Sequence, residues 1–366
     1  MNTLGARGRL SVAHAGMANT IQDLGRAGHR HQGVPLSGAL DIDLARCANA
    51  LVYNNDNEAC VEMRALGPRL ICEEGPVLVG LAGEAHATIA RNQGTQHALE
   101  AWSSATLFSG DVLHIRTISQ GCAYLAFQAG LDLPSLLGSR SGFAKWNAPG
   151  LLSRPLAIGD ALCTPPLPGD WPEANHGATE AMGWRAMRAP AWRPVPASAP
   201  LVVRAIPGPQ VDHFSAASQT HFWSSTWTAS VAQDRMGLRL QGEPLLHASK
   251  SHQDMVSEAV TPGAIQVPTD GQPIALLADC QTMGGYPKIA VVISADLPLL
   301  AHCPPGTAIQ FSAVDLKDAH NAKRALDEEW RKWRGQLRPY SEPGVVDHNA
   351  LQLHNLISGA VDASEP

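Results

Sequence analysis

A short segment of the chain, residues 279–288, carries five different kinds of polar side chain. Its sequence, DCQTMGGYPK, supplies an acid, an amide, a hydroxyl, a phenol and an amine in the order Asp279, Gln281, Thr282, Tyr286 and Lys288. Gly284 and Gly285 lie among them, and glycine lets a backbone approach a neighbouring group closely. Such a set could bind an anion and orient a small polar carbonyl compound. An ordinary hairpin turn with incidental polar residues is the alternative, and the spacing alone leaves both open.

Two apolar runs must position this segment. Residues 273–278 and 289–293 are short, rich in leucine or β-branched residues, and bounded by turn residues. These properties predict two buried strands. A polar, glycine-containing loop between buried strands is a common location for binding groups.

A second polar segment, QDRMG at residues 233–237, joins two further predicted strands. It places Asp234 and Arg235 beside a glycine, and Arg239 follows two residues later. An arginine next to an acid can form an internal ion pair, or it can bind a planar anionic ligand in a bidentate fashion. The sequence leaves these two roles open.

The N-terminal segment, residues 20–41, is a glycine-rich polar loop followed by a helix start. Its glycine-rich composition predicts a folded loop. Its candidate binding residues are Gln22, Asp23, Arg26, Ser37 and Asp41. Arg26, flanked by glycines, is a candidate anion or carboxylate clamp, with a structural salt bridge to Asp23 as the alternative. His29 and His31 form an H-x-H pattern without a carboxylate at helical spacing, so we expect no metal site.

Composition describes a globular protein. The chain has 366 residues, 45% hydrophobic and 16% charged, with a net charge of −6. This mild charge, with no lysine–arginine block, does not favour nucleic-acid binding. The seven cysteines are scattered and form no C-x-x-C pair, which argues against a disulfide framework or a structural zinc site. No segment resembles a signal peptide or a membrane span, so a cytoplasmic location is expected.

Turns that separate short apolar runs at intervals of about ten residues indicate a mainly β protein. We predict an N-terminal β domain over residues 1–163, a linker rich in proline and tryptophan over 164–200, a second β domain with a closing helix over 201–335, and a polar tail over 336–366. Few helices are expected. They are residues 41–52, with acids at the N-terminal end, and residues 318–333, with an apolar stripe that ends in Trp330 and Trp333.

Several motifs occur in a colinear order over about residues 10–315. They are TIQDLGR (20–26), GVPLSGALD (33–41), ANALVYN (48–54), RAIPGPQVDHF (204–214), DRMGLRL (234–240), GAIQVP (263–268), DGQPIALLADCQTMGGYPK (270–288) and ISADLPLLA (293–301). Together they resemble the biotin-dependent carboxyltransferase-like family, which includes allophanate hydrolase subunit 2 and the C subunit of the bacterial ATP-dependent 5-oxoprolinase.

The resemblance implies a fold of two cyclophilin-like β-barrel domains. It also implies one of three functions: a subunit of an ATP-dependent 5-oxoprolinase, a carboxyltransferase component for urea or a urea-like substrate, or a non-catalytic regulator that antagonises a histidine-kinase inhibitor. The first is favoured and implies a partner that resembles allophanate hydrolase subunit 1, and also a lactam-hydrolase subunit. ATP and Mg²⁺ are then expected in the complex, without covalent biotin on this chain, which has no Met-Lys-Met motif.

Under this interpretation, Lys288, Arg235 and Asp279 are the candidate catalytic residues, because phosphoryl transfer requires cations placed on moving charge. The other motif residues are candidate substrate-binding groups: Gln281, Thr282, Gly284, Gly285, Tyr286, Gln22, Asp23, Arg26, Ser37, Asp41, Asp234, Arg239 and Gln266. No nucleophile–base pair stands out from the sequence, and a packing role is the alternative for each residue.

The chain departs from the family pattern after the GSRS motif. There its sequence is GFAKWNAPGLLSRPL (142–156), where members usually have a glycine-rich segment followed by Gly-Arg. Met283 also stands where a second threonine is more usual. We expect the first change to alter one wall of the site, and with it the identity of the substrate.

Overall fold

The computed structural model describes residues 7–145, 150–166, 182–185, 190 and 200–341. Most of the predicted linker, and the tail beyond residue 341, therefore lie outside the described residues. The first domain holds two sheets. The six-stranded sheet has the order β11-β1-β4-β9-β6-β7, with bounds β1 (Arg9–His14), β4 (Arg69–Glu74), β6 (Ala85–Ala90), β7 (Gln96–Leu99), β9 (Val112–Ile118) and β11 (Ala161–Cys163).

The second sheet of this domain is seven-stranded, in the order β2-β3-β10-β5-β8-β12-β22. Its strands are β2 (Thr20–Gln22), β3 (Cys60–Met63), β5 (Val77–Ala82), β8 (Ser103–Leu107), β10 (Ala123–Phe127), β12 (Met182–Arg185) and β22 (Arg338–Ser341). An apolar cluster that includes Leu10, Val61 and Leu125 fills the space between the two sheets.

The second domain is a closed barrel with the strand order β13-β20-β17-β18-β15-β14-β21. Its strands are β13 (Leu201–Pro207), β14 (Thr226–Gln233), β15 (Gly237–Gln241), β17 (Ala264–Gln266), β18 (Ile274–Leu276), β20 (Lys288–Val292) and β21 (Ala308–Ala313). A small two-stranded sheet, β16 (Glu258–Ala259) with β19 (Met283–Gly284), lies beside it. A mainly β fold and a barrel in the second half are thus confirmed, whereas the described strands of the first half form two sheets in place of one closed barrel.

Helices are few in the described part of the chain. The α-helices are α1 (Ile42–Ala50), α2 (Ala216–Ser224), α3 (Leu297–Ala301) and α4 (Leu316–Arg334), and short 3₁₀ turns are η1 (Arg30–Gln32), η2 (Gly150–Leu152), η3 (Val211–His213) and η4 (Lys250–His252). The predicted start of α1 is confirmed, because the Asp41 carboxylate caps it by accepting a hydrogen bond from the backbone N–H of Leu44. No helix of the described residues is long and apolar enough to cross a membrane.

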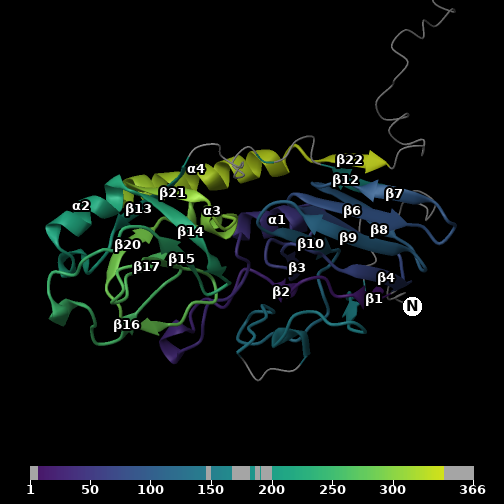
Figure 1. Cartoon of the computed structure of the whole chain (residues 1–366). Helices are drawn as coiled ribbons and strands as arrows, with labels where there is room; N and C mark the ends of the chain where they lie inside the picture. The colour runs from purple at the N-terminus through teal and green to yellow at the C-terminus, as the bar shows by residue number, and fades with distance from the viewer. Residues whose placement is uncertain (1–6, 146–149, 167–181, 186–189, 191–199, 342–366) are drawn as a thin grey trace, which may run out of the picture.

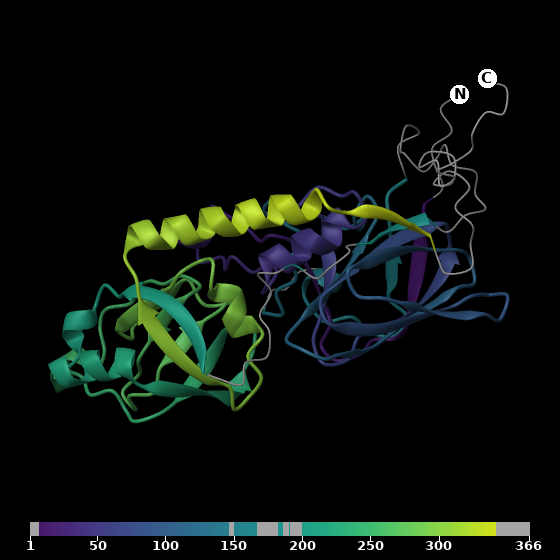
Figure 2. The same ribbon diagram turned by 90° about the horizontal axis from the view of Figure 1, so that it is seen from above.

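Helix α4 joins the two domains. It leaves the barrel and runs along the molecule to the first domain, as Figure 2 shows from above. Near its C-terminal end, Trp333 packs edge-on against Trp102 of the first domain, and Arg46 of α1 lies 3.8 Å from the ring centroid of Trp330. One apolar cluster consequently runs from α1 through α4 into the barrel. This packing connects the two domains.

Two strands from the segments that flank the barrel domain in the sequence extend a sheet of the first domain. Strands β12 and β22 come from the predicted linker and tail, and they pair with each other at the edge of the first domain's sheet. Pro339 is compatible with this position, because the edge of a sheet tolerates a missing N–H donor.

In Figure 1 the purple segment that carries η1 lies next to β16 of the barrel domain. There Arg30 donates to the backbone carbonyls of Val260 and Gln281.

Candidate functional site

A cleft of about 730 Å³ opens between the two domains. The first domain contributes Thr20, Glu62 and the segment at Phe143, and the barrel domain contributes Arg235 and Asp279. The segment at residues 143–145 belongs to the stretch that departs from the family pattern, so the structure places that departure on a cleft wall. Two of the three predicted catalytic residues, Arg235 and Asp279, are brought together here.

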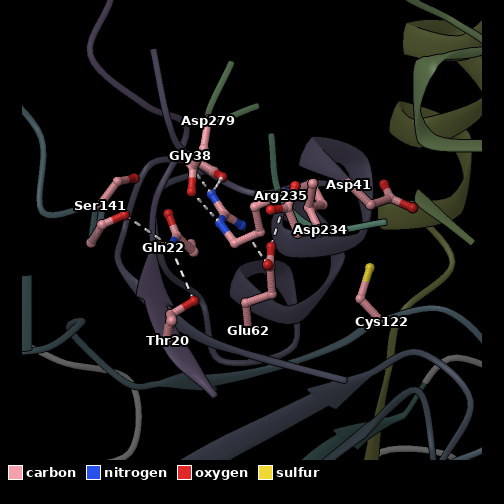
Figure 3. Close-up of polar contacts among 12 residues, drawn as sticks. Thr20, Gln22, Gly38, Asp41, Glu62, Cys122, Ser141, Asp234, Arg235 and Asp279 are labelled. Carbon is pink, nitrogen blue, oxygen red and sulfur yellow. Dashed lines mark hydrogen bonds and ion pairs between the residues drawn. The ribbon is translucent and has the colours of Figure 1, made fainter. Parts of the chain in front are cut away.

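The Arg235 guanidinium is the centre of this site. Its Nε and Nη2 donate to the two carboxylate oxygens of Asp279 at 2.8 and 3.0 Å, a bidentate geometry. Its Nη1 donates to Glu62 at 2.5 Å, and Nη2 donates to the carbonyl of Gly38 at 2.6 Å. Figure 3 shows the guanidinium between the Asp279 and Glu62 side chains. Arg235 therefore connects the barrel to two segments of the first domain.

The charge of Arg235 is held in a largely buried position, with 15% of its side chain exposed. Burial alone lowers the pKa of the guanidinium, but the carboxylates of Glu62 and Asp279 outweigh this and raise its pKa above the usual value. Arg235 thus stays cationic and forms an ion pair with each carboxylate. The sequence offered an ion pair with the adjacent Asp234 or a ligand clamp, and the structure shows Arg235 in ion pairs with Glu62 and Asp279 instead.

Glu62 extends the network into the first domain. Its Oε2 accepts hydrogen bonds from the Tyr124 hydroxyl at 2.6 Å and from the backbone N–H of Leu40 at 2.8 Å. The Tyr124 oxygen in turn accepts from the backbone N–H of Asp41. Burial, followed by the neighbouring Cys122, Glu62 and Asp41, raises the pKa of Tyr124, so the phenol remains a neutral donor. The floor of the cleft is consequently a fixed array of polar groups.

A cysteine, a histidine and an aspartate meet at the far end of this network. His302 Nε2 lies 2.7 Å from Asp41 Oδ2 and 3.7 Å from Cys122 Sγ. Both partners approach the same ring nitrogen, whereas a relay for nucleophilic catalysis needs them on opposite nitrogens. Cys122 and Asp41 are also fully buried. The geometry fits an interdomain contact and does not form a nucleophile–base pair.

A second, smaller cleft of about 470 Å³ lies on the barrel domain alone. Five predicted binding residues line it: Asp234, Arg239, Gln266, Gln281 and Tyr286. Gln281 Nε2 donates to Gln266 Oε1 at 3.2 Å, and Gln266 Nε2 donates to the Tyr286 carbonyl at 3.3 Å. The segment at residues 233–236 contributes lining residues to both clefts and separates them.

The third predicted catalytic residue, Lys288, lines neither of these two clefts. It is buried on β20, and its ammonium donates to Glu258 at 3.3 Å. Thr282 is also buried. At Gly284 a Cβ atom would lie 2.5 Å from Gln266 Nε2, so this glycine allows a close approach within the protein itself. The predicted loop residues are thus divided among the two clefts and the interior.

The predicted N-terminal residues lie beneath the cleft. Asp23 accepts hydrogen bonds from the hydroxyls of Ser139 and Ser141 at 2.6 and 2.5 Å. Arg26 is buried and donates to the carbonyl of Ser141, and burial lowers the pKa of its guanidinium. Gln22 donates to Thr20, which lines the cleft, at 3.0 Å.

Two further N-terminal candidates contribute at the domain boundary. Ser37 is buried, and its backbone N–H donates to the carbonyl of Ala278 at 3.0 Å, directly before Asp279. Asp41 caps α1 and contacts His302. These segments therefore position the cleft floor, and among them Thr20 reaches the cleft itself.

Glu62, Tyr124 and His302 were not predicted from the sequence. Glu62 is the one acid in the otherwise apolar strand CVEM, and a charge in a buried strand requires a partner. This single acid in an apolar strand was the sequence signal that could have identified Glu62. Within the described residues, no group of three or more histidine, cysteine or acidic side chains could hold a metal ion.

Comparison with known proteins identifies the class. The family model described as carboxyltransferase domain, subdomain A and B, matches residues 32–313. The chain belongs to this family.

Among individual relatives, the chain is 35% identical to the 5-oxoprolinase C subunit of Escherichia coli (strain K12), over 86% of this chain and 94% of that protein. It is 34% identical to the 5-oxoprolinase C subunit of Haemophilus influenzae, over 83% and 91% of the two chains. The solved structure of Kluyveromyces lactis urea amidolyase matches with a TM-score of 0.74 and 26% identity, over 89% of this chain. This chain spans 20% of the urea amidolyase chain.

Proposed function

We propose that the protein is a subunit of an ATP-dependent 5-oxoprolinase, which converts 5-oxoproline to glutamate. The observation that carries the proposal is 35% identity over 94% of the E. coli 5-oxoprolinase C subunit, and the cleft between the domains has Glu62, Arg235 and Asp279 in its lining. The name of that relative implies a complex. A partner that resembles allophanate hydrolase subunit 1, and a lactam-hydrolase subunit, are therefore part of the proposal, as is a cytoplasmic location.

The cleft floor offers a specific way to act on a lactam. An arginine side chain has five N–H donors, and the bonds to Asp279, Glu62 and Gly38 use four of those of Arg235. The remaining N–H is on Nη1, and Arg235 lines the cleft. We assign this donor to the lactam carbonyl oxygen, where a fixed donor stabilises developing negative charge. Because the two carboxylates hold the guanidinium, the donor is placed before the substrate arrives.

The carboxylates at the floor do not fit a Mg²⁺ site. Glu62 and Asp279 direct oxygens to Arg235, and Mg²⁺ requires carboxylates free to bind it with near-octahedral geometry. We therefore propose that Mg²⁺ and ATP, which would phosphorylate the unreactive lactam carbonyl, bind elsewhere in the complex.

The test is phosphate release by the chain mixed with its partner subunits. We expect release that requires both ATP and 5-oxoproline, together with formation of glutamate. No release with any partner, combined with tight binding to a histidine-kinase inhibitor, would support a regulatory protein instead.

A second candidate function is carboxyl transfer from biotin to urea or a urea-like nitrogen. The observation that favours it is the match to urea amidolyase, at a TM-score of 0.74. Because the chain has no Met-Lys-Met motif, the biotin would be carried by a partner. In the same mixture, bicarbonate- and urea-dependent phosphate release without any response to 5-oxoproline would select this function over the first.

A further inference from the structure

Most charged side chains of the interdomain cleft have partners. Arg235 is paired with both Glu62 and Asp279. The Asp234 carboxylate accepts the backbone N–H groups of Met236 and Gly237 at 2.7 and 3.2 Å. The acids are therefore occupied by protein donors.

Two cations on the first-domain wall differ from these groups. Arg64 is half-buried in the cleft and takes part in no ion pair or side-chain hydrogen bond within the described part of the chain. Lys145 is exposed in the same cleft, and its ammonium lies 3.1 Å from the sulfur of Met236, which is a weak acceptor without charge. Both cations are consequently available to an anion that enters the cleft.

The neighbouring wall is apolar. Ile118, Phe143, Pro304 and Pro305 line the same cleft as the two cations. A ligand that fits both features has one anionic group and a compact carbon skeleton. A guanidinium binds a carboxylate with two parallel hydrogen bonds, and an ammonium adds a point charge.

We propose that Arg64 and Lys145 form a recognition site for the carboxylate of a small lactam or amide, while Arg235 faces its carbonyl. Naming a lactam rests on the proposed function, whereas the carboxylate site itself rests on the cleft. Arg64 is the main specificity-determining residue, because its half-buried side chain is the more restricted of the two. Lys145, which is exposed and flexible, contributes less.

Calorimetric titration of the full chain tests the site with three probes: 5-oxoproline, 2-pyrrolidinone, which is the same lactam without the carboxylate, and inorganic phosphate. We expect 5-oxoproline to bind about 10- to 100-fold more tightly than 2-pyrrolidinone, as a charge-assisted hydrogen bond would give. Arg64→Gln should remove this preference, and Lys145→Gln should reduce it. The matched control is Arg324→Gln, at an exposed position on α4 outside the cleft.

Several results would overturn the site. They are equal binding of the two lactams, a preference that survives in Arg64→Gln, tighter binding of phosphate than of 5-oxoproline, or no binding of 5-oxoproline by the wild-type chain. Turnover separates this inference from the proposed function. Arg64-dependent binding without phosphate release in the complex would reject the function and keep the site. Normal turnover with an unchanged KM for 5-oxoproline in Arg64→Gln would reject the site and keep the function.

Discussion

The two clefts of this protein are built in different ways. The interdomain cleft is assembled from both domains, and its floor is a buried guanidinium held by two carboxylates. The second cleft is formed by the barrel domain alone, and its polar lining consists of amides, a phenol, the Asp234 carboxylate and the exposed Arg239. Only the first combines fixed charge at its floor with unpaired cations, among the described residues, on its wall.

The difference shows that buried charge is concentrated at the floor of the interdomain cleft. Ion pairs removed from water are costly unless geometry and hydrogen bonding compensate for lost hydration. Arg235 meets that condition with four hydrogen bonds to three residues. Arg235 belongs to residues 233–236, which line both clefts as a segment, and it also contacts the first domain. A change at Arg235 therefore affects both stability and the site.

The largest expected effect is that of Arg235→Met. The substitution leaves Glu62 and Asp279 buried without a counterion, so we expect a loss of about 3–5 kcal/mol in the free energy of unfolding. Urea denaturation measures it. Arg239→Met, in the second cleft, is the matched control and should change stability by less than about 0.5 kcal/mol. Similar values for the two variants would remove the distinction between the clefts.

Tyr124→Phe tests whether the network beneath the first cleft acts as a unit. It deprives Glu62 of a donor and the Asp41 N–H of an acceptor, so we expect a loss of about 1–3 kcal/mol. Tyr286→Phe, which alters the exposed phenol of the second cleft, should be close to neutral. A neutral Tyr124→Phe would show that the Glu62 position does not depend on this hydrogen bond.

The cysteines give a pH-dependent comparison. Burial raises the pKa of Cys303, which lines the interdomain cleft, to about 12. In the unfolded chain the thiol has a pKa of about 8.5. Between this pKa and that of the native thiol, the unfolded chain has lost a proton that the native chain keeps. Stability should therefore be unaffected below about pH 8 and then fall by about 1.4 kcal/mol per pH unit for this thiol. Unfolding of Cys303→Ser between about pH 8 and 10 should show a shallower decline. An identical slope would contradict burial of the thiol.

Lys288→Met is expected to have only a small effect on stability. Its partner Glu258 is half exposed and can be rehydrated, so we expect a change of about 1 kcal/mol or less. The variant then isolates the catalytic role predicted from the sequence. Since Lys288 lines neither cleft, we expect phosphate release per folded molecule to be retained. Loss of that activity in a normally folded variant would restore Lys288 as a catalytic residue.

The sequence predicted the elements of the barrel better than the directions of its side chains. Strands β18 and β20 and the loop between them lie where the apolar runs placed them. Within the loop, however, Asp279 faces the interdomain cleft, Gln281 and Tyr286 line the second, and Lys288 is buried. Neighbouring residues in strands and turns point in different directions, so closeness in sequence did not define one site.

The interdomain site could not be predicted from the spacing of residues in the sequence, for a different reason. Glu62 and Arg235 are 173 positions apart in the chain, and their contact depends on how α1 and α4 pack the domains together. The sequence placed Asp41 at the start of a helix, because helix-end signals are local, and the structure shows that it caps α1. Its contact with His302, which spans the two domains, is a tertiary feature that no local pattern records.

A pair of blocking substitutions tests whether substrate binds in the interdomain cleft. Ala144 is exposed in the interdomain cleft and Ala232 is exposed in the second cleft. In the complex with its partner subunits, we expect Ala144→Trp to abolish 5-oxoproline-dependent phosphate release and Ala232→Trp to retain it, with unfolding unchanged in both. Loss of activity in Ala232→Trp with full activity in Ala144→Trp would place the substrate in the second cleft and contradict binding between the domains.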